Sequence, residues 1–259
     1  MLHKTRGIVL KTTAFRSSSV IAQVFTEKFG LQSYLVNGVR KTGGRISFNV
    51  LQPLHLLEMV VYHKSAGSLQ RIKELRNQPV FFSIPLDIAK STVSLFICEV
   101  LYKVLRRQPG EDTPLFQYLF HSLEWLDQHK GGVGNFHLLF LMGLTRYLGF
   151  YPDIRAAGET AAYEAVGKPR TTAAAGEEYF DLQNGQFLKN APVHSWYISP
   201  PLTTFWRQLS QGRYEQLSEF KISGEERRLL LRSLLEYYAL HIEGFGQIRS
   251  HEILQELFE

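Results

Sequence analysis

Cysteine is nearly absent from this chain of 259 residues, since Cys98 is the only one. A single cysteine cannot form an intramolecular disulfide, and it cannot supply a zinc site built on several thiolates. Because Cys98 stands within an apolar helical stripe, we expect it to be a small buried side chain.

Long apolar runs are missing as well. The longest, about residues 138–144, is far shorter than the ~20 residues that a membrane-spanning helix needs. Residues 1–6 lead into a strand-like run without a small-residue cleavage site, so we expect no signal peptide. These absences predict a cytoplasmic protein.

Catalytic motifs are also absent. The chain has no G-x-x-x-x-G-K-[ST] loop, and the glycines of residues 38–44 do not match a dinucleotide-binding fingerprint. There is no H-E-x-x-H pair, and the nine histidines are scattered. We therefore expect no enzyme activity. An enzyme hidden in the second part of the chain is the alternative, although no set of residues meets even the first geometric requirement of a catalytic site.

The charge of the chain is uneven. Residues 1–80 hold 12 Lys and Arg against 3 Asp and Glu, whereas the rest of the chain holds 17 against 21. A net charge of +9 on the first part and −4 on the second indicates a polyanion partner for the first part. The alternative is a basic surface that is exposed to solvent and binds no partner.

The pattern of apolar residues divides the chain near residue 80. Strand-like runs are expected at 7–13, 19–26, 31–36, 51–62 and 69–75, and five short strands joined by turn signals suggest a small closed barrel. Helical periods follow at 86–107, 113–129, 135–148, 203–209 and 229–241. An insert at about 153–195 carries a hairpin signal, Asn184-Gly185, between two apolar arms.

The expected fold class is therefore α+β with two domains. Residues 1–80 form the basic barrel, and residues 81–259 form a helical domain that carries the hairpin insert.

Basic side chains in the turns and strand ends of the barrel are the candidate nucleic-acid contacts, because cations there can follow a phosphate backbone. They are Arg16, Lys28, Arg40, Lys41, Arg45 and Lys64. Phe15 and Phe48 lie in connections and are candidates for stacking on bases, with core packing as the alternative. For Phe25 and Tyr34, which lie inside strands, we expect core packing.

Several short motifs follow one another in a particular order. They are residues 7–11 (GIVLK), 25–26 (FT), 29–30 (FG), 38–41 (GVRK), 51–53 (LQP), 144–153 (LTRYLGFYPD) and 248–254 (IRSHEIL). Together they resemble the RecO family of bacterial recombination mediators.

The resemblance implies an OB-fold barrel followed by a helical domain, and a protein without catalytic activity. It implies binding of single- and double-stranded DNA, annealing of complementary strands, and help in loading RecA onto DNA coated by single-strand-binding protein, together with RecR. Such a protein is nucleoid-associated when it is on DNA. An RNA-binding or assembly adaptor that uses the same barrel is the alternative.

Two further expectations depend on the resemblance. Many family members carry four zinc-binding cysteines after the stretch that 144–153 matches, but this chain has none there. We therefore expect no zinc or other cofactor, and the hairpin as a degenerate remnant of the zinc finger. The resemblance also implies docking of the C-terminal tail of single-strand-binding protein on the helical domain, for which the candidates are Arg107, Lys130, Arg146 and Tyr147. Cations at helix ends equally complement the helix dipole.

Overall fold

The computed structural model describes the chain except residues 16, 40–45, 65–68, 107–109, 156–177 and 258–259. The chain forms two compact units. The first consists of Met1–Val133 together with Gln247–Phe258, and the second consists of Gly134–Gly246. No helix within the described ranges is long and apolar enough to cross a membrane.

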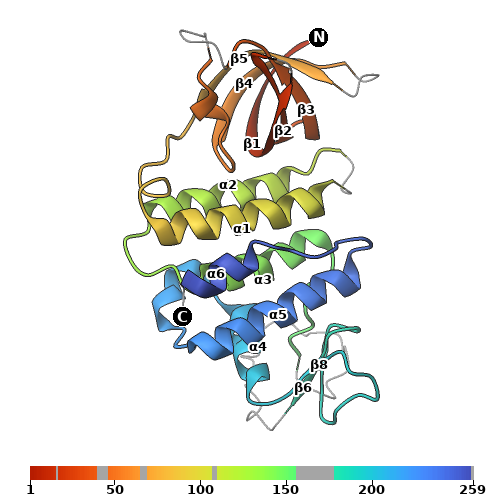
Figure 1. Ribbon diagram of the computed structural model, residues 1–259. Helices are drawn as coiled ribbons and strands as arrows, with labels where there is room; N and C mark the ends of the chain where they lie inside the picture. The colour runs from red at the N-terminus through yellow and green to blue at the C-terminus, as the bar shows by residue number, and fades with distance from the viewer. Residues whose placement is uncertain (16, 40–45, 65–68, 107–109, 156–177, 258–259) are drawn as a thin grey trace, which may run out of the picture. The chain divides into compact units, whose positions relative to one another are not determined.

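Five strands between Leu2 and Asn77 form the predicted closed barrel (Figure 1). Its strands pair in the order β1-β2-β3-β5-β4, with β3 and β5 parallel and all other neighbours antiparallel. The bounds are β1 (Leu2–Phe15), β2 (Ser19–Thr26), β3 (Gly30–Val36), β4 (Leu56–Tyr62) and β5 (Gln70–Asn77).

The strand predicted at 51–62 begins later than expected. A 3₁₀ helix, η1 (Phe48–Leu51), precedes it, and β4 starts only at Leu56. Pro53 lacks an N–H for pairing, and Leu54 turns the backbone with a φ of 60°. The Leu54 N–H then donates to the carbonyl of Val9 over 2.7 Å, which ties this turn to β1.

Alternate strand residues fill the barrel, so that Val9 and Val24 point inward together with Leu57, Met59 and Val61. At Gly7 a Cβ atom would lie 2.5 Å from Val24 Cγ1 and 2.6 Å from Met59 Cε, so any larger residue would force these side chains to shift. Tyr34 and Phe25 are both buried, as predicted.

Three helices complete the first unit: α1 (Ile88–Leu105), α2 (Thr113–Gln128) and α6 (His251–Leu257). Residues on the outer face of the barrel strands are also buried, because they pack against α1 and α2. Phe25 approaches Phe116 of α2 with ring centroids 6.0 Å apart. Cys98 of α1 donates to the Leu10 carbonyl and is buried, as predicted.

The second unit has helices α3 (Phe136–Leu148), α4 (Leu202–Gln211) and α5 (Gly224–His241) and a 3₁₀ helix, η2 (Tyr214–Glu219). Its small sheet has the order β7-β6-β8, from β6 (Tyr179–Asp181), β7 (Gln186–Leu188) and β8 (Tyr197–Ile198). The predicted hairpin is confirmed: β6 and β7 pair, and Gly185 takes the positive φ of 68° that the turn needs. The α+β fold class is also confirmed, whereas the domain boundary at residue 80 stays a prediction.

Candidate nucleic-acid interface

Each acidic side chain of the barrel lies beside a Lys or Arg residue of the barrel itself. Glu27 pairs with Arg6 at 2.6 Å, Glu58 pairs with Arg76 at 2.7 Å, and Glu74 lies 3.5 Å from Lys73. The hydrogen bond from Arg6 lowers the pKa of Glu27, and the hydrogen bond from Arg76 lowers the pKa of Glu58. Because each of the three acids faces a cation, the excess positive charge belongs to the other Lys and Arg residues.

Arg6 has a structural role. Its guanidinium lies over the rings of Phe120 and Phe116, with distances of 4.7 and 5.3 Å to the ring centroids. Gln117 of α2 donates to Glu27, the carboxylate that Arg6 binds. This cation therefore joins the barrel to α2, and we do not count it as a nucleic-acid contact.

Two of the predicted cations lie at the same end of the barrel. Lys28 lies in the β2–β3 turn and Lys64 follows β4, and both are exposed. Their chain neighbours Phe29 and His63 stack with ring centroids 3.9 Å apart, and His3 packs edge-on against Phe29. Burial, together with repulsion from His3 and the N-terminal amine, lowers the pKa of His63.

Nothing in the sequence pattern predicts the stack of His3, Phe29 and His63. The three rings are far apart in the chain, and no motif or spacing links them. Only the pairing of β1 with β4, which places His3 opposite Val61, brings the imidazoles to the turn that carries Lys28.

The two candidate stacking rings lie elsewhere. Phe15 is the last residue of β1 and pairs with Ser19, so it stands at the opposite end of β2 from Lys28. Phe48 begins η1 and is 40% exposed. The structure therefore does not place Phe15 beside Lys28 and Lys64.

The remaining predicted contacts, Arg16, Arg40, Lys41 and Arg45, lie outside the described residues. Their role in binding stays a prediction. The connection that carries the last three joins β3, which ends at Val36, to η1, where the exposed ring of Phe48 stands.

The predicted partner-binding residues belong to different parts of the chain. Lys130 is exposed after α2 in the first unit, and Arg107 lies outside the described residues. Arg146 of α3, in the second unit, lies over the Tyr151 ring and donates to its hydroxyl group and to the Ser210 carbonyl. Tyr147 is 37% exposed. Arg146 thus has contacts within the second unit, and docking of a partner at these four residues stays a prediction.

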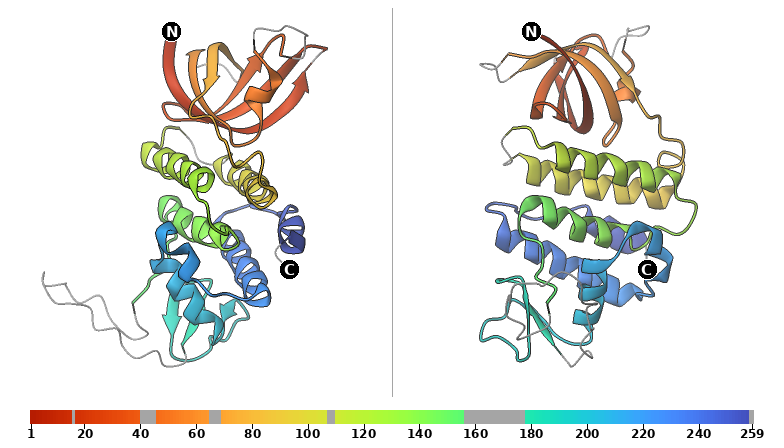
Figure 2. Two further views of the ribbon diagram at one scale, coloured as in Figure 1. Left: turned by 90° about the vertical axis from the view of Figure 1, so that its left-hand side faces the viewer. Right: turned by 180° about the vertical axis from the view of Figure 1, so that it is seen from behind.

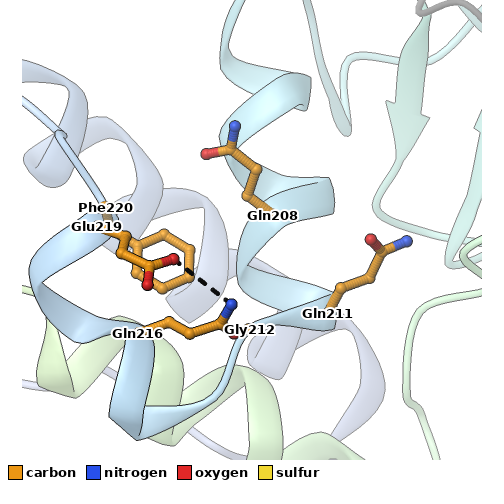
Figure 3. Close-up of a pocket in the computed structure, with 6 residues that line it drawn as sticks. All are labelled: Gln208, Gln211, Gly212, Gln216, Glu219 and Phe220. Atoms are coloured by element: carbon orange, nitrogen blue, oxygen red, sulfur yellow. Dashed lines mark hydrogen bonds between the residues drawn. The ribbon is translucent and has the colours of Figure 1, made fainter.

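The second unit also contains a cavity of about 380 Å³ (Figure 3). It is lined by Gln208, Gln211, Gly212, Gln216, Glu219 and Phe220. Glu219 is the only charged residue of this lining, and neither Lys130 nor Arg146 is part of it.

The described part of the insert does not fit the family's zinc site. The only cysteine of the chain lies in α1, and no three His, Cys, Asp or Glu side chains of the described residues gather around a point that could hold a metal ion. Asp181 instead accepts from the backbone of Gln183 and from Asn184, and so fixes the hairpin turn. That the chain binds no zinc stays a prediction.

A closed five-stranded barrel with one parallel strand pair and an excess of cations belongs to the class of OB-fold proteins, which bind oligonucleotides and oligosaccharides. Two family models together cover nearly the whole chain, and the first ends where the barrel ends. The model for Recombination protein O N terminal matches residues 1–78, and the model for Recombination protein O C terminal matches residues 85–250. The chain belongs to the RecO family of DNA repair proteins.

Curated relatives agree over the full length. The chain is 38% identical to the DNA repair protein RecO of Bacteroides fragilis over 260 residues, which cover 100% of both chains. It is 33% identical to the RecO protein of Phocaeicola vulgatus, again with 100% of both chains covered. With that of Flavobacterium johnsoniae it shares 33% identity over 98% of each chain.

Proposed function

We propose that this protein is a non-catalytic recombination mediator that binds single- and double-stranded DNA and anneals complementary strands. In this proposal it also helps to load RecA onto DNA coated by single-strand-binding protein, together with RecR. The observation that carries the proposal is the basic barrel, whose three acidic side chains each face a cation of the barrel itself.

Annealing follows physically from such a surface. Cations between two phosphate backbones reduce their repulsion, and base pairing then supplies the favourable free energy. No nucleotide needs to be hydrolysed for this step. Family membership supports DNA as the polyanion, and the proposed partners rest on the same membership.

The test is binding and annealing of fluorescent DNA strands by the full chain without added nucleotide. If about five cations contact phosphates, the plot of log K against log salt for single strands has a slope near −3.5, at roughly −0.7 per contact. We expect Arg40→Ala with Lys41→Ala to flatten this slope by about one unit and to weaken all sequences alike.

A matched control removes the same charge elsewhere. Lys189→Ala with Lys221→Ala takes away two exposed cations of the second unit and should leave the slope unchanged. An unchanged slope in the Arg40 and Lys41 variant would exclude residues 40–41 from the site. Tighter binding of RNA than of DNA by the wild type would favour the RNA adaptor instead.

A further inference from the structure

The last residue of β4, Tyr62, presents an aromatic ring on the outer face of the barrel. Its exposed fraction is 48%, whereas Val61 before it is completely buried and faces the interior. Within the described part of the chain, the Tyr62 ring contacts no other aromatic ring. An aromatic residue with half of its surface in solvent offers a large and rigid contact area to a ligand.

Strand pairing places other outward side chains in one row with Tyr62. Leu2 of β1 lies opposite Tyr62 on one side, and Arg71 of β5 lies opposite it on the other; the strands are seen in Figures 1 and 2. Leu35 of β3 pairs with Arg71 and continues the row. Side chains directly opposite on antiparallel strands have Cβ atoms about 4.5–5.5 Å apart, so Leu2, Tyr62 and Arg71 form one continuous surface.

The charges around this row are mostly positive. Those on and beside the same outer face are Lys4, Arg6, Glu58, Lys64, Lys73, Glu74 and Arg76. Glu58 pairs with Arg76 at 2.7 Å. Glu74 lies 3.5 Å from Lys73. Arg71 forms no ion pair with any residue that the structure describes. This balance favours an anionic ligand and disfavours a second copy of the chain on the same face, because both copies would be cationic there.

The surface adjoins the end of the barrel that carries two of the predicted phosphate contacts. Lys64 follows Tyr62 by two residues and is exposed. The residue between them, His63, stacks on Phe29, the chain neighbour of Lys28. An aromatic ring and several unpaired cations therefore share one end of the barrel, which is the combination that single-strand-binding barrels use.

We propose that Tyr62 stacks on an unpaired base of single-stranded DNA while Arg71 contacts an adjacent phosphate. The inference rests on the proposed function and adds to it the residue that distinguishes single strands from duplexes. Aromatic rings stack on any base, and a cation beside the ring follows the backbone. In a duplex the bases stack on one another and expose only their edges in the grooves, so a duplex offers the ring no base face. Leu2 extends the apolar area beside the ring.

The test measures binding of a fluorescent single strand and of the corresponding duplex by the full chain. We expect Tyr62→Ile to weaken single-strand binding at least about fivefold and to change duplex binding by less than about twofold, because only the single strand loses a stacking contact. Tyr62→Phe keeps the ring and should bind both DNAs like the wild type. Arg71→Gln should flatten the plot of log K against log salt for single strands by roughly 0.7.

A matched control and a second measurement separate this effect from a general one. Phe82→Ile removes a ring that is 76% exposed outside the barrel and should leave both DNA affinities unchanged. Tyr62→Ile should keep the thermal unfolding curve of the wild type, since Ile suits a strand and the site is exposed. In the wild type, ultraviolet light should cross-link a single strand containing iodouracil to Tyr62, as located by mass spectrometry.

Equal single-strand affinity of Tyr62→Ile and the wild type, or cross-links at other residues only, would overturn this inference and leave the proposed function intact. Equal losses for single strands and duplexes would show that the ring does not stack on unpaired bases. Self-association of the wild type in sedimentation that Tyr62→Ile abolishes would mean that the face joins two copies of this chain. If the wild type binds no single-stranded DNA, the inference and the proposed function both fail.

Discussion

Individual polar side chains inside the second unit form hydrogen bonds between segments that lie far apart in the chain. In the second unit, Tyr238 of α5 donates to the Leu141 carbonyl of α3, and Tyr237 donates to the Phe150 carbonyl. Arg227 donates to Asn135, which in turn donates to the Phe220 carbonyl. Each bond satisfies a group that burial would otherwise leave unpaired, so these residues contribute both stability and a unique packing.

His137 predicts how the stability of the protein depends on pH. It is buried in α3, and this burial, with repulsion from Arg227, lowers its pKa to about 3. The unfolded chain takes up a proton near pH 6.5, whereas the folded chain does not until about pH 3. The unfolded state therefore binds more protons in this range, and stability falls as the pH drops below 6.5.

The measurement is urea unfolding of the wild type and of His137→Gln at pH 7 and pH 5. We expect the wild type to lose about 2 kcal/mol more between these two values than the variant, at about 1.4 kcal/mol per pH unit. Equal losses in the two proteins would mean that His137 does not cause the pH dependence.

At the scale of elements, one carboxylate of α1 makes several of the hydrogen bonds that hold the start of α6. Glu99 of α1 accepts from the backbone of Arg249 and Ser250 and from the Ser250 hydroxyl group, while Lys103 donates to the Gln247 carbonyl. Leu254 adds a buried apolar contact. A helix of seven residues is too short to be stable alone, so its order depends on these contacts.

Glu99→Ala is therefore expected to release α6. Hydrogen bonds to a charged group contribute about 1.5–3 kcal/mol, so amide exchange in residues 251–257 should accelerate at least about tenfold. Hydrogen exchange read by mass spectrometry measures this directly. Glu236→Ala, an exposed change in α5, serves as the control. Unchanged exchange in the Glu99 variant would show that the Lys103 hydrogen bond and the burial of Leu254 are sufficient to hold the helix.

At the scale of the whole molecule, the barrel does not bury all its apolar surface by itself. Ile8, Leu10 and Phe25 are buried, yet they alternate with the residues that fill the barrel. Phe25 meets Phe116 of α2, and the backbone of Leu10 meets Cys98 of α1. The helix pair is thus part of the same compact unit as the barrel.

This arrangement predicts the outcome of truncation. A fragment of residues 1–80 exposes Ile8, Leu10 and Phe25, and each such side chain contributes about 1.5–3 kcal/mol when buried. The total is comparable to the whole stability of a small domain. We expect urea to unfold this fragment at a much lower concentration than a fragment of residues 1–133. Equal midpoints would instead support an independent barrel domain that ends at residue 80.

Local patterns in the sequence determined much of the secondary structure of this protein. Short β-branched runs with turn signals predicted the barrel, helical periods predicted the positions of α1, α2 and α3, and Asn184-Gly185 predicted the hairpin. The uneven charge favoured residues 1–80 as the part that meets a polyanion, which stays a prediction. These features are readable because each depends on residues that are close together in the chain.

Only the tertiary structure decided which distant groups meet. The parallel pairing of β3 with β5, the stack of Phe29 on His63 and the ion pair of Arg6 with Glu27 join residues that are tens of positions apart. The sequence does not predict that Phe82 and Leu86 are exposed either, because an apolar segment before a helix usually packs inward. Asp127, more than forty residues away, holds that segment by its backbone and leaves these side chains in solvent.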